Sequence, residues 1–370
     1  MPPSDRQIAP ADASPLQDKV VLVTGGTGSF GQVMLRRLLT LGPREIRILS
    51  RDEEKQWQTA HAHGLHEIGL AGDQVRFHIG DVRDRRSVDH VMRGVDVVFN
   101  AAALKQVPRA EHFAYEAVQT NIIGAQNVID SAVAHRVEVV LMISTDKAAK
   151  PVNAMGMTKA VQEKLAASAG WRAQAEGTRI ACVRYGNVLS SRGSVVPLFR
   201  RQIELGKPLT VTDPAMTRFL LTLEDAVDLV LLATARAQGG EIFVHDAPAA
   251  TVETVAEAVA RHAGVDPEIE ITGIRPGEKR HEVLVTEEEA LHCKRVAGAY
   301  FAILPPLPMP LTHAAYREEE DVSFFEFRSD TARRLEVDDV IELLERVLPV
   351  RLWEGSFERA ERSERSEEPA

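Results

Sequence analysis

Apolar residues in the first half of the chain occur alternately as short unbroken runs and as runs with helical spacing. The run Val20–Val23 is unbroken, which is typical of a strand buried on both faces of a sheet. The segment that follows has apolar residues along one side of a helix and ends at Gly42. The same reasoning predicts strands at 45–50, 75–81, 95–103, 137–145 and 179–188, and helices at 111–134 and 155–170. Strands that alternate with helices predict an α/β fold built on a doubly wound parallel sheet.

The second half of the chain has a different pattern. After about Arg192 the segments are helix-rich and shorter in period, and residues 333–348 have the spacing of a last amphipathic helix. We therefore expect a flexible leader at 1–16, a sheet domain at 17–191, a smaller mixed C-terminal lobe at 192–350 and a disordered charged tail at 351–370. Some segments of the lobe are expected to return to the sheet domain.

The composition of the 370 residues, 44% hydrophobic and 26% charged, is that of an ordinary soluble protein. The net charge of −10 argues against general attraction to nucleic acid or to an anionic membrane, so an anionic ligand needs local positive groups. Cys182 and Cys293 are far apart and have no partners at metal-ligand spacing, so we expect two thiols and no metal site. The sequence has neither a membrane-length apolar run nor a signal-peptide pattern, and we expect a cytoplasmic location.

A glycine-rich turn links the first predicted strand to its helix. Gly25, Gly28 and Gly31 are spaced so that the backbone can turn sharply and approach a pyrophosphate, with Thr27, Ser29 and Phe30 between them. The helix N-terminus then supplies N–H donors and positive potential. The buried strand before the turn and the amphipathic helix after it favour a dinucleotide site over a plain turn.

Charged residues at the end of the second strand bear on the choice of dinucleotide. A carboxylate in this place usually accepts from the ribose 2′-hydroxyl of NAD, but here Ser50 and Arg51 precede Asp52, and Lys55 follows one helical turn later. The planar guanidinium of Arg51 suits a 2′-phosphate, so we expect NADP in preference to NAD. Alternatively, Arg51 and Lys55 form only the solvated start of a helix.

The next two strands end in residues that fit the same ligand. Asp81 and Val82 follow the third strand, where an aspartate can contact the adenine amino group. Small residues follow the fourth strand and let the backbone approach the ribose and the nicotinamide phosphate; they are Ala101, Ala102 and Ala103.

With these motifs in this order, the chain resembles the extended short-chain dehydrogenases/reductases, which have a Rossmann-like fold. It is similar in particular to the soluble dehydratases that act on UDP-N-acetylglucosamine, through segments at 103–111, 120–128, 144–164, 183–199, 213–231, 239–244 and 274–284. The resemblance implies conversion of UDP-N-acetylglucosamine to a 4-keto-6-deoxy sugar, with inversion at C5 in many members. The form "NAMGMTK" at 153–159 resembles the branch that feeds N-acetyl-L-fucosamine in capsule or O-antigen synthesis.

The implied reaction is redox-neutral: C4 is oxidised by NADP⁺, water is lost across C5 and C6, and hydride returns to C6. Thr145, Asp146 and Lys147 stand where related dehydratases have threonine, aspartate and glutamate. By this resemblance Asp146 is the C6 acid, Lys147 is the C5 base and Thr145 holds the C4 oxygen. A lysine base requires a lowered pKa, which desolvation or a cation such as Lys159 would favour and the adjacent carboxylate would oppose.

The superfamily usually has a tyrosine four residues before its active-site lysine, and here that position is Met155. Lys159 lies on the same helical face, and the resemblance implies that it binds the nicotinamide ribose. A thioether transfers no proton, so we interpret Met155 as an apolar packing residue against substrate or cofactor. Asp146 is then the nearest candidate for acid–base work at C4.

The C-terminal lobe supplies the substrate contacts by resemblance. Asn187 and the backbone of Val195 and Val196 are expected to contact uridine diphosphate, and Arg218 to clamp its pyrophosphate. Three further candidates could equally form structural salt bridges, and they are Lys105, Arg275 and Glu278.

Two other functions remain open from the sequence. A 4-epimerase or reductase on the same fold usually keeps the tyrosine and needs no acid–base pair at C5 and C6, which Asp146 and Lys147 provide. Loss of the tyrosine favours a non-catalytic nucleotide-binding protein, and retention of Asp146, Lys147 and Lys159 argues against it. The resemblance also implies a homo-oligomer, with a hexamer among the options.

Overall fold

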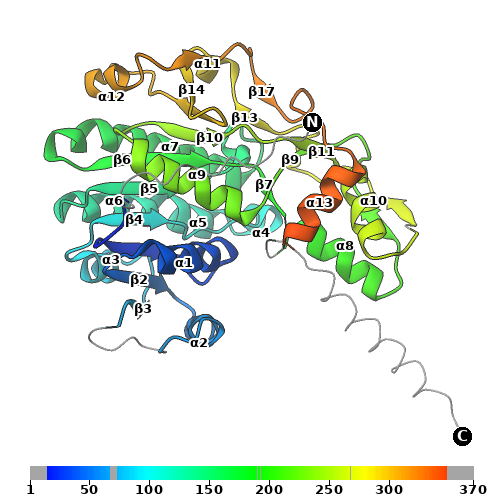
Figure 1. Ribbon diagram of the computed structural model, residues 1–370, viewed down its shortest axis with the longest axis horizontal. Helices are drawn as coiled ribbons and strands as arrows, with labels where there is room; N and C mark the ends of the chain where they lie inside the picture. Colours follow the sequence, from blue (N-terminus) through cyan, green and yellow to red (C-terminus); the bar gives the residue numbers. More distant parts are fainter. Residues whose placement is uncertain (1–14, 67–72, 190, 192, 267, 348–370) are drawn as a thin grey trace, which may run out of the picture.

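The computed structural model describes residues 15–66, 73–189, 191, 193–266 and 268–347 (Figure 1). The predicted tail at 351–370 and nearly all of the predicted leader lie outside these ranges. Leu16, which we assigned to the leader, is fully buried in the main core.

A ten-stranded sheet forms the centre of the molecule, in the order β16-β14-β15-β10-β6-β5-β4-β1-β2-β3. Its parallel part comprises β1 (Val20–Thr24), β2 (Glu45–Ser50), β3 (Val75–Ile79), β4 (Val97–Asn100), β5 (Val139–Ile143), β6 (Arg179–Arg184) and β10 (Ile242–His245). The chain first builds outward from β1 to β3 and then restarts on the other side at β4. The doubly wound parallel sheet is therefore confirmed, with its topological switch point between β1 and β4.

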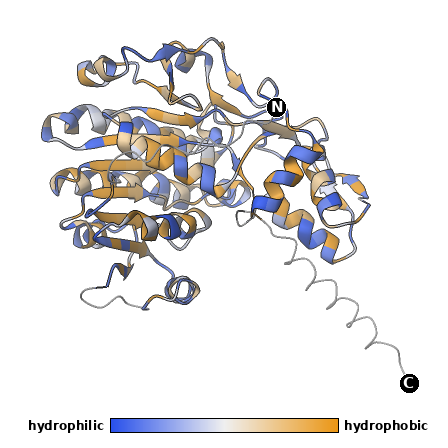
Figure 2. Ribbon diagram, viewed as in Figure 1, coloured by the Kyte–Doolittle hydropathy of each residue, from blue (hydrophilic) through white to orange (hydrophobic). Residues whose placement is uncertain are grey.

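Helices cover both faces of this sheet (Figure 1). Val21 and Val23 of β1 face α1 (Ser29–Leu41) and α9 (Leu223–Arg236) in one apolar cluster, to which α2 (Glu53–Ala62) also contributes. Val20 and Leu22 face the opposite cluster, with α3 (Arg85–Met92), α6 (Gly124–Ala134) and α7 (Ala154–Ala173). Alternate residues of one strand thus pack on opposite helical layers, which explains the unbroken apolar run in the sequence. Figure 2 shows the hydrophobic strands between these layers.

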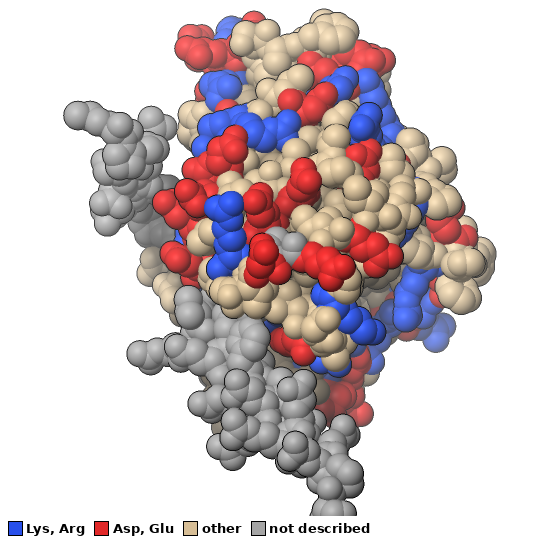
Figure 3. Space-filling view, turned by 90° about the vertical axis from the view of Figure 1, so that its right-hand side faces the viewer, with Lys and Arg blue, Asp and Glu red and all other residues tan. Residues whose placement is uncertain are grey.

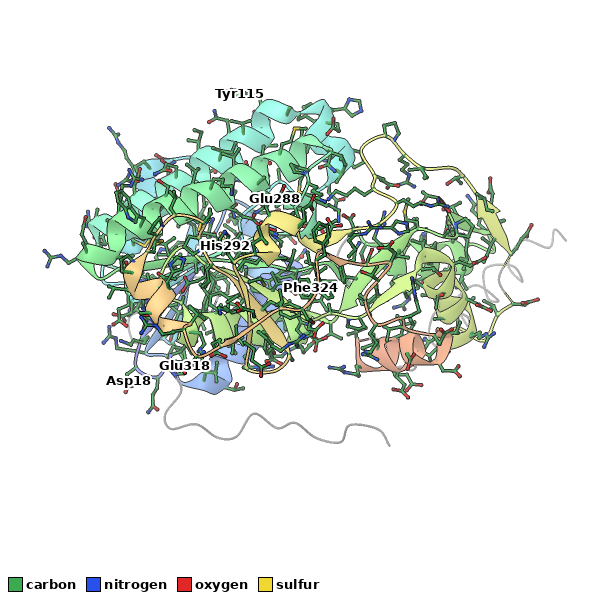
Figure 4. All side chains as sticks on the ribbon, turned by 90° about the horizontal axis from the view of Figure 1, so that it is seen from above. Asp18, Tyr115, Glu288, His292, Glu318 and Phe324 are labelled. Carbon is green, nitrogen blue, oxygen red and sulfur yellow. The ribbon has the colours of Figure 1, made fainter. Side chains whose placement is uncertain are left out.

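The predicted continuous helix at 111–134 is wrong. The structure has α4 (Val107–His112), α5 (Ala114–Ala117), a π-helical turn η1 (Val118–Ile123) and then α6. The buried side chain of Asn121 in this wide turn bonds both backbone groups of Leu104 and the Thr158 hydroxyl, at 2.8–3.0 Å. This cross-link fixes the loop after β4 against α7. Seen from above, Tyr115 of α5 lies at the outer edge of the helical layer (Figure 4).

The smaller lobe begins where β6 ends. The predicted strand at 179–188 divides in two, because β6 stops at Arg184 and β7 (Asn187–Val188) pairs instead with β9 (Thr217–Leu221), which also pairs with β11 (Ala249–Thr251). The lobe core joins α8 (Val195–Glu204), α10 (Val252–His262) and α13 (Val337–Val347), beside the short sheet of β8 (Leu209–Val211) and β12 (Ile269–Ile271). Acidic and basic side chains are interspersed on the face that carries this lobe (Figure 3).

Several segments of the second half of the chain lie in or against the large sheet. They include α9 and β10, and the antiparallel strands β14 (Cys293–Val296), β15 (Tyr300–Ile303) and β16 (Glu320–Asp321). The remaining elements are β13 (Val283–Val285), which pairs with β17 (Phe327–Arg328), and the short helices α11 (Glu287–Ala290) and α12 (Pro310–Ala315). Within the described ranges, no helix has both the length and the apolar character needed to cross a membrane.

A buried ion-pair network joins the two halves of the chain. The Arg184 guanidinium on β6 is almost fully buried and pairs with Glu163 of α7 at 2.6 Å and with Glu289 of α11 at 2.8 Å. It also donates to the carbonyl of Leu284, at 2.8 Å. Because one side chain compensates two carboxylates, its loss leaves both of them without a counter-charge.

We predict that Arg184→Ala lowers the free energy of unfolding by about 3–5 kcal/mol, since breaking a buried pair leaves an uncompensated buried charge. Denaturant unfolding monitored by circular dichroism measures this change. Arg201→Ala is the control, because the Arg201 side chain is 67% exposed and its ion pair is weak, so little change is expected. Equal stability of the two variants would contradict the prediction.

Candidate active site

A cavity of about 770 Å³ lies at the carboxyl ends of the parallel strands, between the sheet and the smaller lobe. The predicted site residues that line it are Gly25, Thr27, Gly28, Ser29, Phe30, Gly31, Arg51, Asp52, Lys55, Asp81, Val82, Ala101, Ala102, Ala103, Lys105, Thr145, Lys147, Met155, Lys159, Asn187, Arg218, Arg275 and Glu278. Asp146, Val195 and Val196 are the predicted residues that do not line it.

The glycine turn has the geometry of a pyrophosphate cradle. Gly25 has φ +66°, and a Cβ on it would lie 2.8 Å from the backbone nitrogen of Ala102. A Cβ on Gly31 would lie 2.3 Å from the carbonyl oxygen of Gly26. Gly28 is the N-cap of α1 and places no side chain over the helix N-terminus, so the first-turn N–H groups face the cavity. These residues fit a dinucleotide.

The acidic residue after β2 is engaged in the protein itself. Asp52 caps α2, because its Oδ1 accepts from the backbone N–H of Lys55 at 3.0 Å, and its Oδ2 pairs with the Lys55 ammonium. The guanidinium of Arg51 is 55% exposed and lies 3.4 Å from Asp81. This end of the cavity therefore presents the Arg51 guanidinium, while the Asp52 carboxylate is engaged with α2 and Lys55.

Asp81 is held as an anion. Burial acts to raise the pKa of Asp81, but hydrogen bonds and charge from Arg83 outweigh it, with a smaller contribution from Arg51, and the pKa is lowered. The Arg83 Nε lies 2.8 Å from Asp81 Oδ2. The carboxylate can therefore accept a further hydrogen bond from a ligand.

Thr145, Asp146 and Lys147 form a compact group at the end of β5. The Thr145 hydroxyl donates to Asp146 Oδ1 at 2.8 Å, and Lys147 Nζ donates to the same oxygen at 3.0 Å. Asp146 is fully buried, and in the described structure its Oδ2 has no hydrogen-bond partner. Burial raises the pKa of Asp146 against the opposing charge of Lys147. Asp146 therefore lies behind the residues that line the cavity, which include its hydrogen-bond partners Thr145 and Lys147.

The lowered pKa that a lysine base requires is not found at Lys147 in the free protein. Burial does act to lower it, but the charges of Asp146 and Glu282 outweigh burial and the repulsion from Arg218, so the Lys147 pKa is raised. The Lys147 ammonium lies 3.4 Å from Glu282, and the Lys147 side chain is 22% exposed toward the cavity. In the free protein Lys147 is a protonated lysine between two carboxylates.

The lowered lysine pKa occurs at Lys159 instead. Burial lowers the pKa of Lys159 to about 8. Its Nζ donates to the carbonyl of Ile143 at 2.8 Å and to Gln162 at 2.9 Å, at the floor of the cavity. Met155, on the same helical face, is 4% exposed and packs with Ala110 and Ala117. Its thioether thus fills the wall of the cavity beside the lysine.

Unpartnered polar atoms gather at the lobe side of the cavity. Asn187 Oδ1, Ser194 Oγ and Glu278 Oε2 are buried atoms without a hydrogen-bond partner in the described structure. Ser194 is the N-cap of α8 and lines the cavity, whereas the Val196 side chain is buried in the lobe core. Arg218 Nη1 is held by the carbonyl of Thr217 at 2.8 Å. Buried groups of this kind are available for a polar ligand.

The sequence profile of the family described as "Polysaccharide biosynthesis protein" matches residues 21–303. The chain belongs to this polysaccharide biosynthesis protein family. It is 45% identical over 335 residues to a UDP-glucose 4-epimerase of Rickettsia felis, across 88% of this chain and 95% of the relative. The UDP-glucose 4-epimerase of Rickettsia akari is 44% identical over the same shares.

Solved structures agree with the fold of this polysaccharide biosynthesis protein. Pen from Bacillus thuringiensis is 34% identical, with a TM-score of 0.80 over 89% of this chain and 98% of Pen. DesIV, a dTDP-glucose 4,6-dehydratase from Streptomyces venezuelae with NAD and TYD bound, is 22% identical, with a TM-score of 0.63 over 81% and 97% of the two chains. The second likeness shows the fold alone.

Sequence reasoning missed two charged residues of this family member's cavity. Glu282 is 2% exposed and lies within 4 Å of three cations, those of Lys147, Arg218 and Lys279. Lys279 Nζ also donates to the carbonyl of Ala149 at 2.5 Å. Both residues lie in the segment 274–284, which carried the resemblance, but periodicity gives no sign that this segment reaches η2 (Asp146–Ala148).

Proposed function

We propose that this protein is an NADP-dependent dehydratase that converts UDP-N-acetylglucosamine to a UDP-2-acetamido-2,6-dideoxy-4-hexulose, with inversion at C5. One observation carries the proposal: Lys147, paired with Asp146 at 3.0 Å, lines the same cavity as the glycine turn. An acid and a base side by side at the end of β5 suit removal of water across two adjacent carbons, a step that epimerisation at C4 does not need.

The proton of the C4 hydroxyl reaches its acceptor, Asp146, through the Thr145 hydroxyl. The Thr145 hydroxyl already donates to Asp146 Oδ1, so it can take a proton from the sugar as it passes its own proton to the carboxylate. Asp146 then holds that proton for the leaving C6 hydroxyl. The raised pKa of Asp146, which burial causes, suits a carboxyl group that must be an acid in the second step.

At C5, Lys147 removes the proton that the C4 ketone has made acidic, and it later returns a proton to the same carbon. This role requires the neutral amine, although the neighbouring carboxylates favour the ammonium. Loss of the ammonium proton to solvent as the sugar binds would leave Lys147 neutral and would keep Asp146 free to accept the C4 proton. The two residues then exchange protons with the sugar without a net gain or loss over one turnover.

The nicotinamide would supply hydride acceptance at C4 and hydride return to C6. Lys159 lies at the floor of the cavity, where its amine would hold the ribose of that ring. Met155 excludes water there and takes no part in proton transfer. Arg218, Asn187 and the N-terminal turn of α8 would hold uridine diphosphate, because a guanidinium and free N–H groups suit phosphate oxygens.

NADP is favoured by the residues after β2. Asp52 is committed to the start of α2, and Arg51 is the exposed cation at the cavity edge. An adenosine 2′-phosphate would be paired there, whereas a 2′-hydroxyl would find no free carboxylate at Asp52. We also keep the predictions of a homo-oligomer and a cytoplasmic location.

A second candidate function is 4-epimerisation of a UDP-sugar. The observation that favours it is the 44–45% identity to the UDP-glucose 4-epimerases of Rickettsia. An epimerase oxidises and reduces C4 only, so it leaves C5 and C6 untouched. The two activities therefore differ in the isotope content and the structure of the product.

We predict that the protein converts UDP-N-acetylglucosamine in D₂O to a 6-deoxy-4-keto product with deuterium at C5, because Lys147 exchanges with solvent. Proton NMR of the reaction measures the deuterium, and the coupling constants report the C5 configuration. Lys147→Met is the control and should give no deuterated product. A 4-epimer without deuterium would instead establish the second candidate, and unchanged substrate would indicate a binding protein.

We predict that Asp146→Asn abolishes cofactor reduction in a single turnover with UDP-N-acetylglucosamine, because an amide cannot accept the C4 proton. The absorbance of reduced nicotinamide follows this step. Lys147→Met is the matched control. This variant should still reduce the cofactor, although the elimination of water is blocked. Normal cofactor reduction by Asp146→Asn would rule out Asp146 as the C4 base.

We predict that Arg51→Ala raises the Kd for NADP about ten-fold or more and leaves the Kd for NAD unchanged, because a charge-assisted bond to the 2′-phosphate is lost. Calorimetric titration with each cofactor tests this. Arg44→Ala removes an exposed arginine outside the cavity and should change neither constant. Equal weakening for both cofactors would mean that Arg51 does not discriminate between them.

A further inference from the structure

Glu282 lies far in sequence from Thr145, Asp146 and Lys147, and the strands β13 and β17 bring it close to them. It directly precedes β13, and its backbone is fixed by Ser329, which follows β17: the Glu282 N–H donates to Ser329 Oγ and the Ser329 N–H to the carbonyl of Glu282, both at 2.9 Å. Ser329 is itself fully buried and hydrogen-bonded to Thr217 of β9. The carboxylate therefore stands at a defined place in the cavity wall.

The contacts of Glu282 combine burial with incomplete hydrogen bonding. Its Oε1 lies 3.4 Å from Lys147 Nζ and 3.9 Å from Arg218 Nε, and its Oε2 lies 3.6 Å from Lys279 Nζ. Oε2 is a buried oxygen without a hydrogen-bond partner in the described structure. A structural salt bridge would be expected to satisfy both oxygens. The carboxylate instead shares its charge among cations that line the cavity.

We propose that Glu282 is a positioning residue for Lys147, which it holds at the cavity wall together with Asp146 and whose charge it balances. This inference rests on the proposed function, in which Lys147 removes and returns the C5 proton. With Asp146 alone, the lysine would be drawn toward the buried acid behind the wall. With Glu282 as a second partner, the Lys147 amine is held between the two carboxylates and is presented to the sugar.

The charge balance around Lys147 involves groups from its own turn, from β9 and from the segment before β13. Asp146 faces it from η2, Arg218 from β9, and Glu282 with Lys279 from the segment before β13. The two carboxylates favour the ammonium form and Arg218 opposes it. Replacement of Glu282 by a neutral isostere removes one favourable charge, so the Lys147 amine becomes neutral at lower pH.

The test is competitive acetylation of the protein with acetic anhydride across a pH series, with Lys147 quantified by mass spectrometry. We expect the labelling midpoint of Lys147 in Glu282→Gln to lie about 1–3 pH units below that of the wild type, as for loss of an opposite charge at this range. In the conservative variant Glu282→Asp, the midpoint should lie between the two, because the charge is kept but stands further from the amine.

Glu289→Gln is the matched control. This substitution also neutralises a carboxylate of an internal ion pair, but Glu289 pairs with Arg184 and lies outside the cavity. It should leave the Lys147 midpoint unchanged even where it lowers the melting temperature. An unchanged midpoint in Glu282→Gln would overturn the proposal. If that variant does not fold, the Glu282→Asp midpoint decides: a value below the wild type supports the proposal, and an equal value overturns it.

Turnover of UDP-N-acetylglucosamine gives a second readout. In Glu282→Gln the acidic limb of the kcat–pH profile should move to lower pH with the labelling midpoint, and kcat should fall about ten-fold or more because the amine is less well oriented. Absence of any turnover by the wild type would refute the proposed function alone. The labelling midpoints would still test the contact between Glu282 and Lys147, because they need no substrate.

Discussion

The parallel register of the central strands is the constraint on which the site depends. Thr24 pairs with Asn100, Asn100 with Met142, and Ile143 with Val183. Because parallel strands end at the same edge of a sheet, the glycine turn, the alanine run and the threonine–aspartate–lysine group emerge side by side. Their separation in sequence is large, and their proximity follows from strand pairing alone.

The site also concentrates positive charge in an acidic protein. The chain carries a net charge of −10, yet the cavity is lined by Arg51, Lys55, Lys105, Lys147, Lys159, Arg218, Arg275 and Lys279. Asp52 and Glu282 each partly neutralise neighbouring cations, through the cap of α2 and through the ion pairs around Lys147. The result is a local field suited to phosphate groups that the overall composition would repel.

The sequence sufficed for features that depend on local spacing. The glycine turn follows from three residues between a strand and a helix, and the shared face of Met155 and Lys159 follows from a separation of one helical turn. Features that depend on distant contacts did not follow. Asn121 of the π-helical turn bonds Leu104, and Glu282 adds to the effect of Asp146 in raising the Lys147 pKa; only the folded chain brings these partners near. Gly186 also lies close to Asp146, since a Cβ on it would lie 3.6 Å from Asp146 Oδ2.

Because β10 and β14–β16 return to the large sheet late in the chain, the two ends of the cavity are completed at different times during synthesis. Every strand of the nucleotide end is complete by Arg184, so that half can assemble while the rest of the chain is still being made. The sugar end needs Glu282, and Glu282 needs Ser329 to fix its backbone. A nascent chain would therefore contain its glycine turn and the strands around it well before the contact between Glu282 and Lys147 can form.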